Sequence, residues 1–345
     1  MFEPIQTRRL LIRPLAESDA GNLAARRSDP QVAEYQNWPT PFPTNEALRI
    51  VNECLAMGGP RNDEWWMAAV VELESGSVIA DVDIALTWDG RTAGIGYNFS
   101  PEYWGKGYAT EAMQNLVDYL FGDLDVRRAF GLIHPDNVAS AQVLERIGML
   151  FEGHTRDSYW SGADVSDDHI YGMTREDWSA WQGRARHRPA QVELIEVGDD
   201  NWWDLYRLRT HKSQERFVAQ MPLSFADALF PEVVDGAPVV PWMRAVEADG
   251  TLAGFVMLAL ATDFHPEPFL WRLLIDRLHQ RRGLGTLAMD LVEETCRRMG
   301  ADSLVTSWSE GRGSPRAFYL SRGFEPTGRL IDGETEGRKR LTVES

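Results

Sequence analysis

Two glycine-rich segments of the chain carry the residue types that bind phosphate groups. The first consists of Trp104, Gly105, Lys106, Gly107, Tyr108, Ala109 and Thr110, and the second of Gln280, Arg281, Arg282, Gly283, Leu284, Gly285 and Thr286. Glycine lets the backbone approach an anion without a Cβ in the way, and basic side chains add positive charge beside it. Each segment predicts a turn before a helix, where backbone amides point towards an anion such as a pyrophosphate.

Other phosphate-binding folds fit these turns less well. Taken singly, either turn could be only a tight connection between a strand and a helix, but their recurrence in matching places favours a shared ligand. A Rossmann fold is disfavoured because both turns follow third or later predicted strands instead of the first. A P-loop is disfavoured because Gly105-Lys106 continues with Gly107 and not with Ser or Thr.

The elements that would position the turns occur in the same order in each half of the chain, as expected of a repeat. Strand-like runs and the helix after the glycine turn are predicted at 10–13, 65–73, 78–86, 94–99, 110–121 and 128–133, and again at 192–195, 242–246, 252–260, 270–275, 286–298 and 303–307. Residues 74–77 and 249–250 predict hairpin turns. Both halves therefore predict an α/β domain in which a mixed sheet carries helices on its faces.

Length and composition predict two ordinary folded domains. The chain has 345 residues, of which 43% are hydrophobic and 25% charged. Residues 183–190 are basic, lack an apolar period and contain Gly183 and Pro189, which is typical of a linker. The predicted domains are therefore 1–182 and 191–345.

A resemblance to a known superfamily indicates which ligand the two turns would bind. Gln280-x-x-Gly283-x-Gly285 matches the acetyl-CoA pyrophosphate motif of the GNAT acetyltransferases, commonly written Gln/Arg-x-x-Gly-x-Gly/Ala. Residues 7–181 resemble the RimJ/RimL branch through the runs 95–97, 101–112, 137–140 and 144–149, with Glu102 where the general motif has Gln or Arg. Residues 191–342 resemble the branch of bacterial spermine and spermidine acetyltransferases through 214–218, 271–276 and 318–324.

The resemblance implies two tandem GNAT-type domains, each a mixed, mostly antiparallel sheet flanked by helices. It implies acetyl-CoA as the cofactor, held at both glycine turns. It adds Leu274 and Ile275 as cofactor-binding residues of the second half, and Asn137 and Ser140 as those of the first.

Tyr319 lies where GNAT members carry the tyrosine that protonates the departing thiolate, so the resemblance assigns it as the catalytic acid. A phenol with a pKa near 10 can do this if it is held close to the sulfur. Without the resemblance, Tyr319 would be interpreted as a core aromatic beside Phe318 and Phe324. The first half has Leu144 at the corresponding spacing from Asn137. Its acid must therefore be another group or water, or be absent.

The remaining polar residues select neither a general base nor a metal site. Acidic residues near the predicted strand ends are too numerous for one to be chosen, and the seven histidines show no ligand spacing. We therefore expect no metal.

The net charge of the chain bears on which molecule would accept the acetyl group. The net charge is −17; residues 1–182 hold 14 basic and 28 acidic residues (−14), and the remainder 21 and 24 (−3). Such a chain repels nucleic acids and favours small cations or basic peptides. We expect an N-acetyltransferase acting on a primary amine of a small cationic acceptor, such as a polyamine-like metabolite or an aminated antibiotic, or on a peptide N-terminus. The alternative is an acyl-CoA-binding sensor or scaffold in which one or both domains are not catalytic.

Location and assembly follow by default. The N-terminal residues lack the pattern of a secretion signal, and no run of about 18 apolar residues occurs. We therefore expect a cytoplasmic protein that binds neither membranes nor nucleic acid. It would be a monomer with pseudo-dimeric halves or a homodimer.

Overall fold

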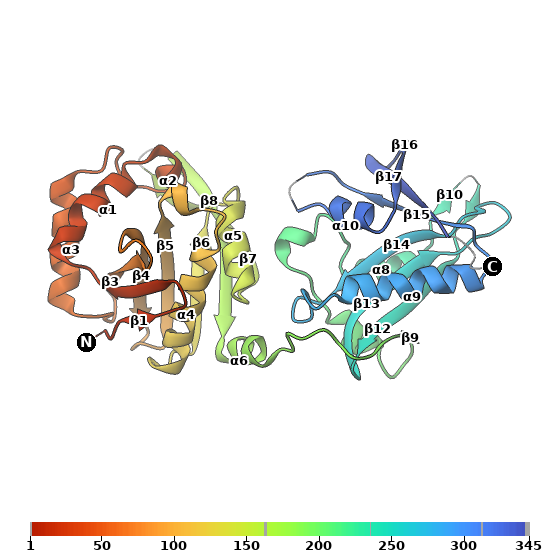
Figure 1. Ribbon diagram of the computed structural model, residues 1–345, viewed down its shortest axis with the longest axis horizontal. Coiled ribbons are helices and arrows are strands. Elements are labelled where there is room, and N and C mark those ends of the chain that lie inside the picture. The colour runs from red at the N-terminus through yellow and green to blue at the C-terminus, as the bar shows by residue number, and fades with distance from the viewer. Residues whose placement is uncertain (1, 162–163, 235, 312, 342–345) are drawn as a thin grey trace. The chain divides into compact units, whose positions relative to one another are not determined.

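The computed structural model describes residues 2–161, 164–234, 236–311 and 313–341. The chain forms two compact units, unit 1 at Met1–Gly183 and unit 2 at Arg184–Ser345 (Figure 1). Residues 184–191 form neither helix nor strand. Within the described ranges, no helix is long and apolar enough to cross a membrane.

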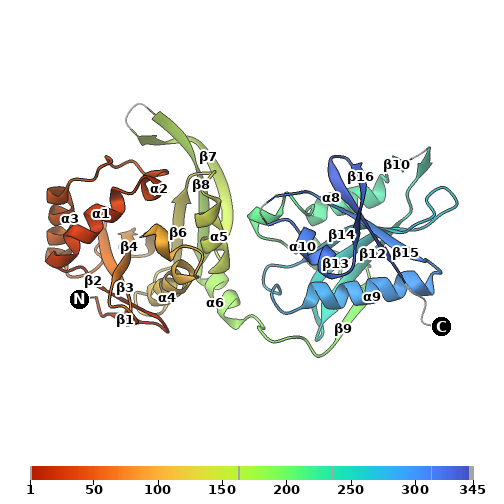
Figure 2. The same ribbon diagram turned by 45° about the horizontal axis from the view of Figure 1, so that its top comes forward.

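Unit 1 is built on an eight-stranded sheet with the order β1-β2-β3-β4-β5-β6-β8-β7. The strands are β1 Ile5–Gln6, β2 Leu10–Pro14, β3 Trp65–Glu72, β4 Val78–Thr87, β5 Thr92–Phe99, β6 Arg128–Ile133, β7 Leu150–Ser161 and β8 Asp164–Thr174. Neighbouring strands are antiparallel except β5 and β6, which run parallel. The expected mixed, mostly antiparallel sheet is confirmed. The β7–β8 hairpin extends well beyond the helices of the unit (Figure 2).

Helices cover the sheet of unit 1. They are α1 Ala20–Arg27, α2 Pro30–Ala33, α3 Thr44–Met57, α4 Tyr108–Gly122, α5 Val138–Arg146 and α6 Arg175–Gly183. Helix α1 contacts β4 and α3 contacts β3, whereas α4 contacts β2, β5 and β6. Helix α4 buries Met113, Leu116, Val117 and Leu120 at helical spacing, and these side chains join the core against the sheet.

Unit 2 repeats this plan with a seven-stranded sheet in the order β16-β17-β15-β14-β13-β12-β9. Its strands are β9 Val192–Glu196, β12 Pro241–Ala248, β13 Thr251–Ala259, β14 Phe269–Ile275, β15 Ser303–Trp308, β16 Glu325–Ile331 and β17 Glu334–Arg340, and a small hairpin joins β10 Val233–Val234 to β11 Ala237–Pro238. In this sheet, too, one pair is parallel, β14 with β15. Both units therefore have the expected α/β fold class.

The helices of unit 2 bury a separate cluster on each face of its sheet. They are α7 Trp202–Tyr206, α8 Met221–Leu229, α9 Leu284–Arg298 and α10 Arg316–Ser321. Met289 and Val292 of α9 pack with one cluster, and Leu205 of α7 packs with the other. Figure 1 shows α9 lying along the sheet on the side from which α10 also projects.

Candidate active site

The two glycine turns have the same backbone conformation. Gly107 and Gly283 are the N-caps of α4 and α9, and both have φ 79° and ψ 7°. Two residues earlier, Gly105 (φ 73°) and Arg281 (φ 64°) are also left-handed. Each residue of the first turn therefore corresponds to one residue of the second turn, at a fixed difference in residue number.

That offset corrects one comparison made from the sequence. Aligning Gly107 with Gly283 places Trp104, and not Glu102, opposite Gln280. Glu102 lies further back, in a short 3-10 helix at Pro101–Tyr103. Trp104 uses its indole nitrogen to donate to the backbone oxygen of Phe99, at 2.7 Å. This hydrogen bond attaches the turn to the last residue of β5.

Both turns present free amides to an anion. Neither N-cap is satisfied by a side chain, and the first helical hydrogen bonds are from Glu111 to Gly107 (3.1 Å) and from Leu287 to Gly283 (3.2 Å). The amides of residues 108–110 and 284–286 precede those bonds and point outward at the positive end of the helix dipole. Such an arrangement fits the pyrophosphate of a nucleotide cofactor.

Beside each turn, two parallel strands separate. Strands β5 and β6 pair at only three positions, from Thr92 to Gly94 on β5, and β14 pairs with β15 only at Phe269 and Leu270. The next residues of β5 and β14 keep their other neighbour but have no strand partner on this side. An extended ligand with amide groups, such as pantetheine, can pair with an edge of this kind.

In unit 2, the opened edge and the turn share a cavity of about 1010 Å³. This volume is at the upper end for ligand sites, so the cavity can hold an extended cofactor arm together with part of a second molecule. The residues predicted to bind cofactor or act in catalysis that line it are Ile275, Gln280, Arg281, Gly283, Leu284, Gly285, Thr286 and Tyr319.

Two predicted cofactor residues have side chains with other roles. Leu274 is 2% exposed and packs in the core on the α7 face of the sheet, so only its backbone belongs to the open edge. Arg282 is buried, and its Nε donates to the backbone oxygen of His187 at 2.9 Å. Residues of the predicted linker are thus bound to unit 2, and the expectation that both arginines of this turn lie beside the phosphates does not hold for Arg282.

Comparison with known proteins gives this site a family. The model of the acetyltransferase (GNAT) domain matches residues 9–150, and that of the acetyltransferase (GNAT) family matches residues 201–324. The chain belongs to the GNAT acetyltransferases. It contains two GNAT domains in tandem, and as a member of this family it is an acetyl-CoA-dependent acetyltransferase.

Similar proteins each match about half of this chain. The uncharacterized N-acetyltransferase p20 of Bacillus licheniformis is 28% identical over 183 residues, 52% of this chain and 99% of that protein. FsC-acetyl coenzyme A-N(2)-transacetylase of Aspergillus fumigatus is 26% identical over 190 residues, 52% of this chain and 79% of that protein. A solved GNAT acetyltransferase from Bacillus anthracis has a TM-score of 0.46 at 27% identity, and covers 50% of this chain and 99% of its own.

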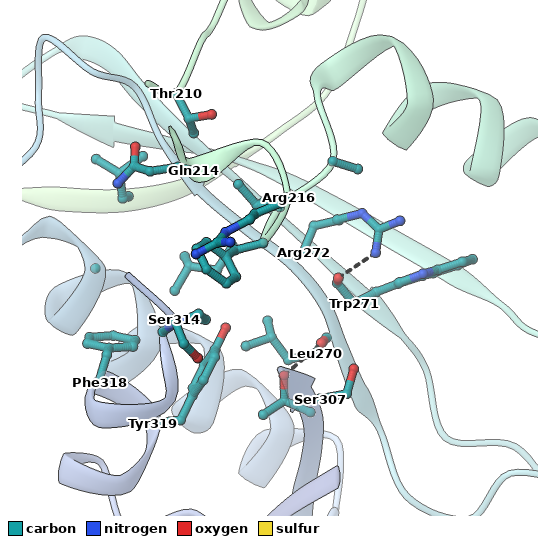
Figure 3. Close-up of a pocket in the computed structure, with 18 of the residues that line it drawn as sticks. Thr210, Gln214, Arg216, Leu270, Trp271, Arg272, Ser307, Ser314, Phe318 and Tyr319 are labelled. Carbon is teal, nitrogen blue, oxygen red and sulfur yellow. Dashed lines mark hydrogen bonds between the residues drawn. The ribbon is translucent and has the colours of Figure 1, made fainter. Parts of the chain in front are cut away.

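In the second GNAT unit, Tyr319 projects from α10 into the cavity. Figure 3 shows its hydroxyl end directed towards the loop that carries Gln214 and Arg216. The ring stacks on Trp308, with centroids 5.8 Å apart and planes at 22°. Burial raises the pKa of Tyr319 to about 12, and a hydrogen bond with Thr306 acts in the opposite direction. The phenol therefore stays protonated, and able to donate, throughout the physiological range.

The first GNAT unit has no phenol at this position. The amide of Phe324 donates to the carbonyl of Tyr319 at 3.1 Å, and the amide of Met149 donates in the same way to Leu144 at 3.0 Å. Leu144 is therefore the structural counterpart of Tyr319. It is 1% exposed and packs in the core.

The two remaining predicted residues of unit 1 lie at the start of α5. Asn137 caps this helix, and its Oδ1 accepts from the amide of Ser140 at 3.1 Å. The backbone oxygen of Ser140 accepts from the Tyr97 hydroxyl, which ties α5 to β5 beside the strand opening.

Sequence reasoning missed Arg9, which braces the turn of unit 1. Its guanidinium lies over the ring of Tyr108 at 4.3 Å, donates to the backbone oxygen of Lys106 at 3.0 Å and pairs with Glu111 at 2.7 Å. No local pattern marks Arg9, because its partners are about a hundred residues away in sequence.

Sequence reasoning did not give the hydrogen-bond partners of the polar groups in the unit 2 cavity. Gln280 Nε2 donates to Gln214 at 2.8 Å and to the backbone oxygen of Ile275 at 3.0 Å. Glu334 accepts hydrogen bonds from the hydroxyls of Ser307 (2.5 Å) and Ser309 (2.6 Å). Within the described residues, no group of three His, Cys, Asp or Glu side chains is placed to hold a metal ion.

Proposed function

We propose that unit 2 transfers the acetyl group of acetyl-CoA to a primary amine of a small cationic acceptor, with Tyr319 as the catalytic acid. The observation that carries this proposal is that the Tyr319 hydroxyl, the open edge of β14 and the amides of α9 all face one cavity. Groups suited to phosphate binding, acyl positioning and proton donation therefore line one cavity, which supports the proposal.

The residues of unit 2 fit the parts of the cofactor one by one. The amides of Leu284, Gly285 and Thr286, with the side chain of Arg281, would bind the pyrophosphate. The edge of β14 at Ile275 would pair with the amides of the extended arm and direct the thioester towards Tyr319.

Acetyl-CoA supplies an acyl group already activated as a thioester. The role left to Tyr319 is to hold its proton until the sulfur carries negative charge, and then to donate it. A phenol buried against Trp308 suits this role, because burial keeps it protonated at neutral pH.

The charge on the cavity wall supports a cationic acceptor. The carboxylates that line the cavity belong to Glu215, Glu232, Asp332 and Glu334. Three arginines line it too: Arg272 is paired with Asp227 at 3.0 Å, Arg281 belongs to the phosphate turn, and Arg216 lies over the ring of Phe217 at 4.4 Å. A small molecule with more than one amino group would match this wall better than an anion would.

We assign the same cofactor to unit 1. The residues proposed to hold it are Trp104, Gly105, Lys106, Gly107, Tyr108, Ala109, Thr110, Asn137 and Ser140. In this proposal the two domains are 1–182 and 191–345, and residues 183–190 connect them.

The test is acetyl-CoA-dependent thiol release by the full chain against polyamines, aminoglycosides and short peptides. Gly107→Glu would first silence unit 1, so that only unit 2 is measured. In that background, Tyr319→Phe is expected to lower kcat about a hundredfold with acetyl-CoA affinity unchanged. Tyr206→Phe is the matched control, because Tyr206 is exposed and stacks on Trp203 of α7. An unchanged kcat in Tyr319→Phe would refute the assignment of the acid, and a peptide as the sole acceptor would refute the small cation.

A further inference from the structure

Unit 1 holds a polar cluster that none of the roles above uses, with three of its four charged side chains buried and that of Asp83 partly exposed. Asp81 and Asp83 lie on the same face of β4, with Arg26 and Arg27 of α1 facing them. Asp81 is fully satisfied: Arg26 Nη2 lies 2.6 Å from its Oδ1, and Asn98 Nδ2 donates to its Oδ2 at 2.9 Å. This carboxylate has a structural role.

Asp83 differs from Asp81 in having an unused acceptor. Its Oδ1 is buried and accepts no hydrogen bond, and Nε of Arg27 is a buried donor without a partner. The Arg27 guanidinium lies instead over the rings of Trp38 (4.4 Å) and Phe42 (5.2 Å). A buried donor and a buried acceptor without partners cost free energy, and Asp83 Oδ1 remains able to accept a hydrogen bond from a ligand.

The position of Asp83 indicates where such a ligand would bind. Asp83 is paired in register with Gly96 of β5, two residues beyond Gly94, where β5 separates from β6. A Cβ on Gly96 would come within 2.9 Å of Asp83 Oδ2, so the carboxylate occupies the space above this glycine. It therefore lies within about one strand spacing, roughly 5 Å, of the edge where a thioester would bind in unit 1.

The carboxylate lies on the face of the sheet away from α5. Ile95 and Tyr97, which flank Gly96, point to the opposite face, where Tyr97 bonds to Ser140 of α5. Asp83 faces the α1 side, where Arg26 and Arg27 lie. An acceptor reaching the thioester from this side would pass the carboxylate.

We propose that Asp83 is the general base of a second acetyl-transfer site, in unit 1, which removes a proton from the ammonium group of a primary-amine acceptor. This inference rests on the proposed function in one respect, that the acceptor is an amine. The freed nitrogen lone pair forms the C–N bond to the acetyl carbon as the C–S bond breaks, and the electron pair of that bond stays on sulfur. The nitrogen's second proton neutralises the thiolate through water, and Asp83 returns its proton to solvent.

The electrostatics of the cluster suit this role. Burial raises the pKa of Asp83 to about 7, the negative charge of Asp81 adds to the rise, and Arg27 and Arg26 oppose it. Cys54 of α3 is the other titratable group facing this carboxyl, and burial raises its thiol pKa as well. A base that titrates near neutral pH is ionised for part of the population and still holds a proton strongly enough to remove it from an ammonium.

The experiment measures unit 1 alone, in the full chain with unit 2 silenced by Gly283→Glu. Turnover of a primary-amine panel is followed by thiol release from pH 5.5 to 9. We expect activity in this parent, a break in log kcat near pH 7, and a fall in kcat of about a hundredfold in Asp83→Asn with acetyl-CoA affinity unchanged. Asp123→Asn, at the exposed end of α4, is the matched control and should behave as the parent.

Several outcomes would overturn the proposal. They are acetyl-CoA binding by the Gly283→Glu parent without turnover, a pH profile of that parent without a break near pH 7, or full kcat in Asp83→Asn. The pH profile needs no change at Asp83, so it remains informative if the variant does not fold. The Gly107→Glu chain reports unit 2 separately. Its turnover would stand even if Asp83 had no role, so the two proposals fail independently.

Discussion

Trp308 stacks on Tyr319 with the two rings 22° from parallel, and Gly337 of β17 lies against the six-membered ring of Trp308. A Cβ added at Gly337 would lie 2.3 Å from the indole ring, which leaves no room for a side chain there. The orientation of the phenol in the cavity thus depends on a glycine in the neighbouring strand.

This relationship predicts an effect of a single methyl group. Gly337→Ala should displace Trp308, on which Tyr319 stacks, lower stability by about 2 kcal/mol and reduce the kcat of unit 2. Gly333→Ala, in the turn before β17, is the control for kcat: its φ of 84° strains alanine and lowers stability too, but its Cβ meets open space and should leave kcat unchanged. Chemical denaturation and thiol release check both. A full kcat in a destabilised Gly337→Ala protein would show that Tyr319 does not depend on this packing.

The glycine that caps α9 allows the effects of a substitution on stability and on acetyl-CoA binding to be told apart. Gly283 and Gly300 both have positive φ, 79° and 84°, and a Cβ at either would meet no atom within 4 Å. Changing either to Ala should destabilise the chain by about 1 kcal/mol, because alanine is strained in this conformation. Only Gly283→Ala should weaken acetyl-CoA binding in calorimetry, because its methyl group would stand where a phosphate approaches. Equal affinities in the two variants would argue against a phosphate site at this turn.

Arg9 predicts a loss of cofactor affinity in unit 1. Replacing Arg9 with Gln removes its bond to the Lys106 carbonyl and its ion pair with Glu111, which loosens the turn. In a Gly283→Glu chain, the Kd for acetyl-CoA should rise about tenfold, equivalent to about 1.4 kcal/mol. Arg8→Gln, at the exposed neighbouring position, should leave the Kd unchanged. A normal Kd in Arg9→Gln would mean that the turn holds its shape without this brace.

Asp83 predicts a pH-dependent change in stability. Its pKa is raised to about 7 in the folded state, against about 3.9 in an unfolded chain. Between these values the folded state binds more protons, so stability falls as pH rises, by at most about 1.4 kcal/mol per pH unit. Asn does not titrate, so the stability of Asp83→Asn does not fall in this way. Its stability relative to the wild type should therefore rise from pH 4 to 7 and stay constant above pH 7. Denaturation midpoints across this range provide the measurement, and a constant difference between the proteins would contradict the shift.

Much of the fold could be predicted because its signals are local. The dipeptide Asp249-Gly250 predicted a hairpin, and both residues have positive φ between β12 and β13, as that turn requires. The helices after the glycine turns begin at Tyr108 and Leu284, each two residues earlier than predicted. The sequence did not show which glycine of each turn is the left-handed cap.

The parts of the site that escaped prediction depend on contacts between distant segments. Arg282 looks like a phosphate ligand from its neighbours, but the carbonyl of His187, 95 residues away in sequence, holds its side chain. Asp83 could not be distinguished from other acidic residues, because only the register with Gly96 places it beside the strand opening. Tyr319 was assigned through its family motif, and it lies on the cavity wall.

The measurement that tests the central claim most directly is the number of acetyl-CoA molecules bound per chain, by isothermal titration calorimetry. The wild type should bind two, Gly107→Glu and Gly283→Glu one each, and the double variant none. A single site in the wild type, lost in only one of the two variants, would contradict the proposal that both halves bind the cofactor.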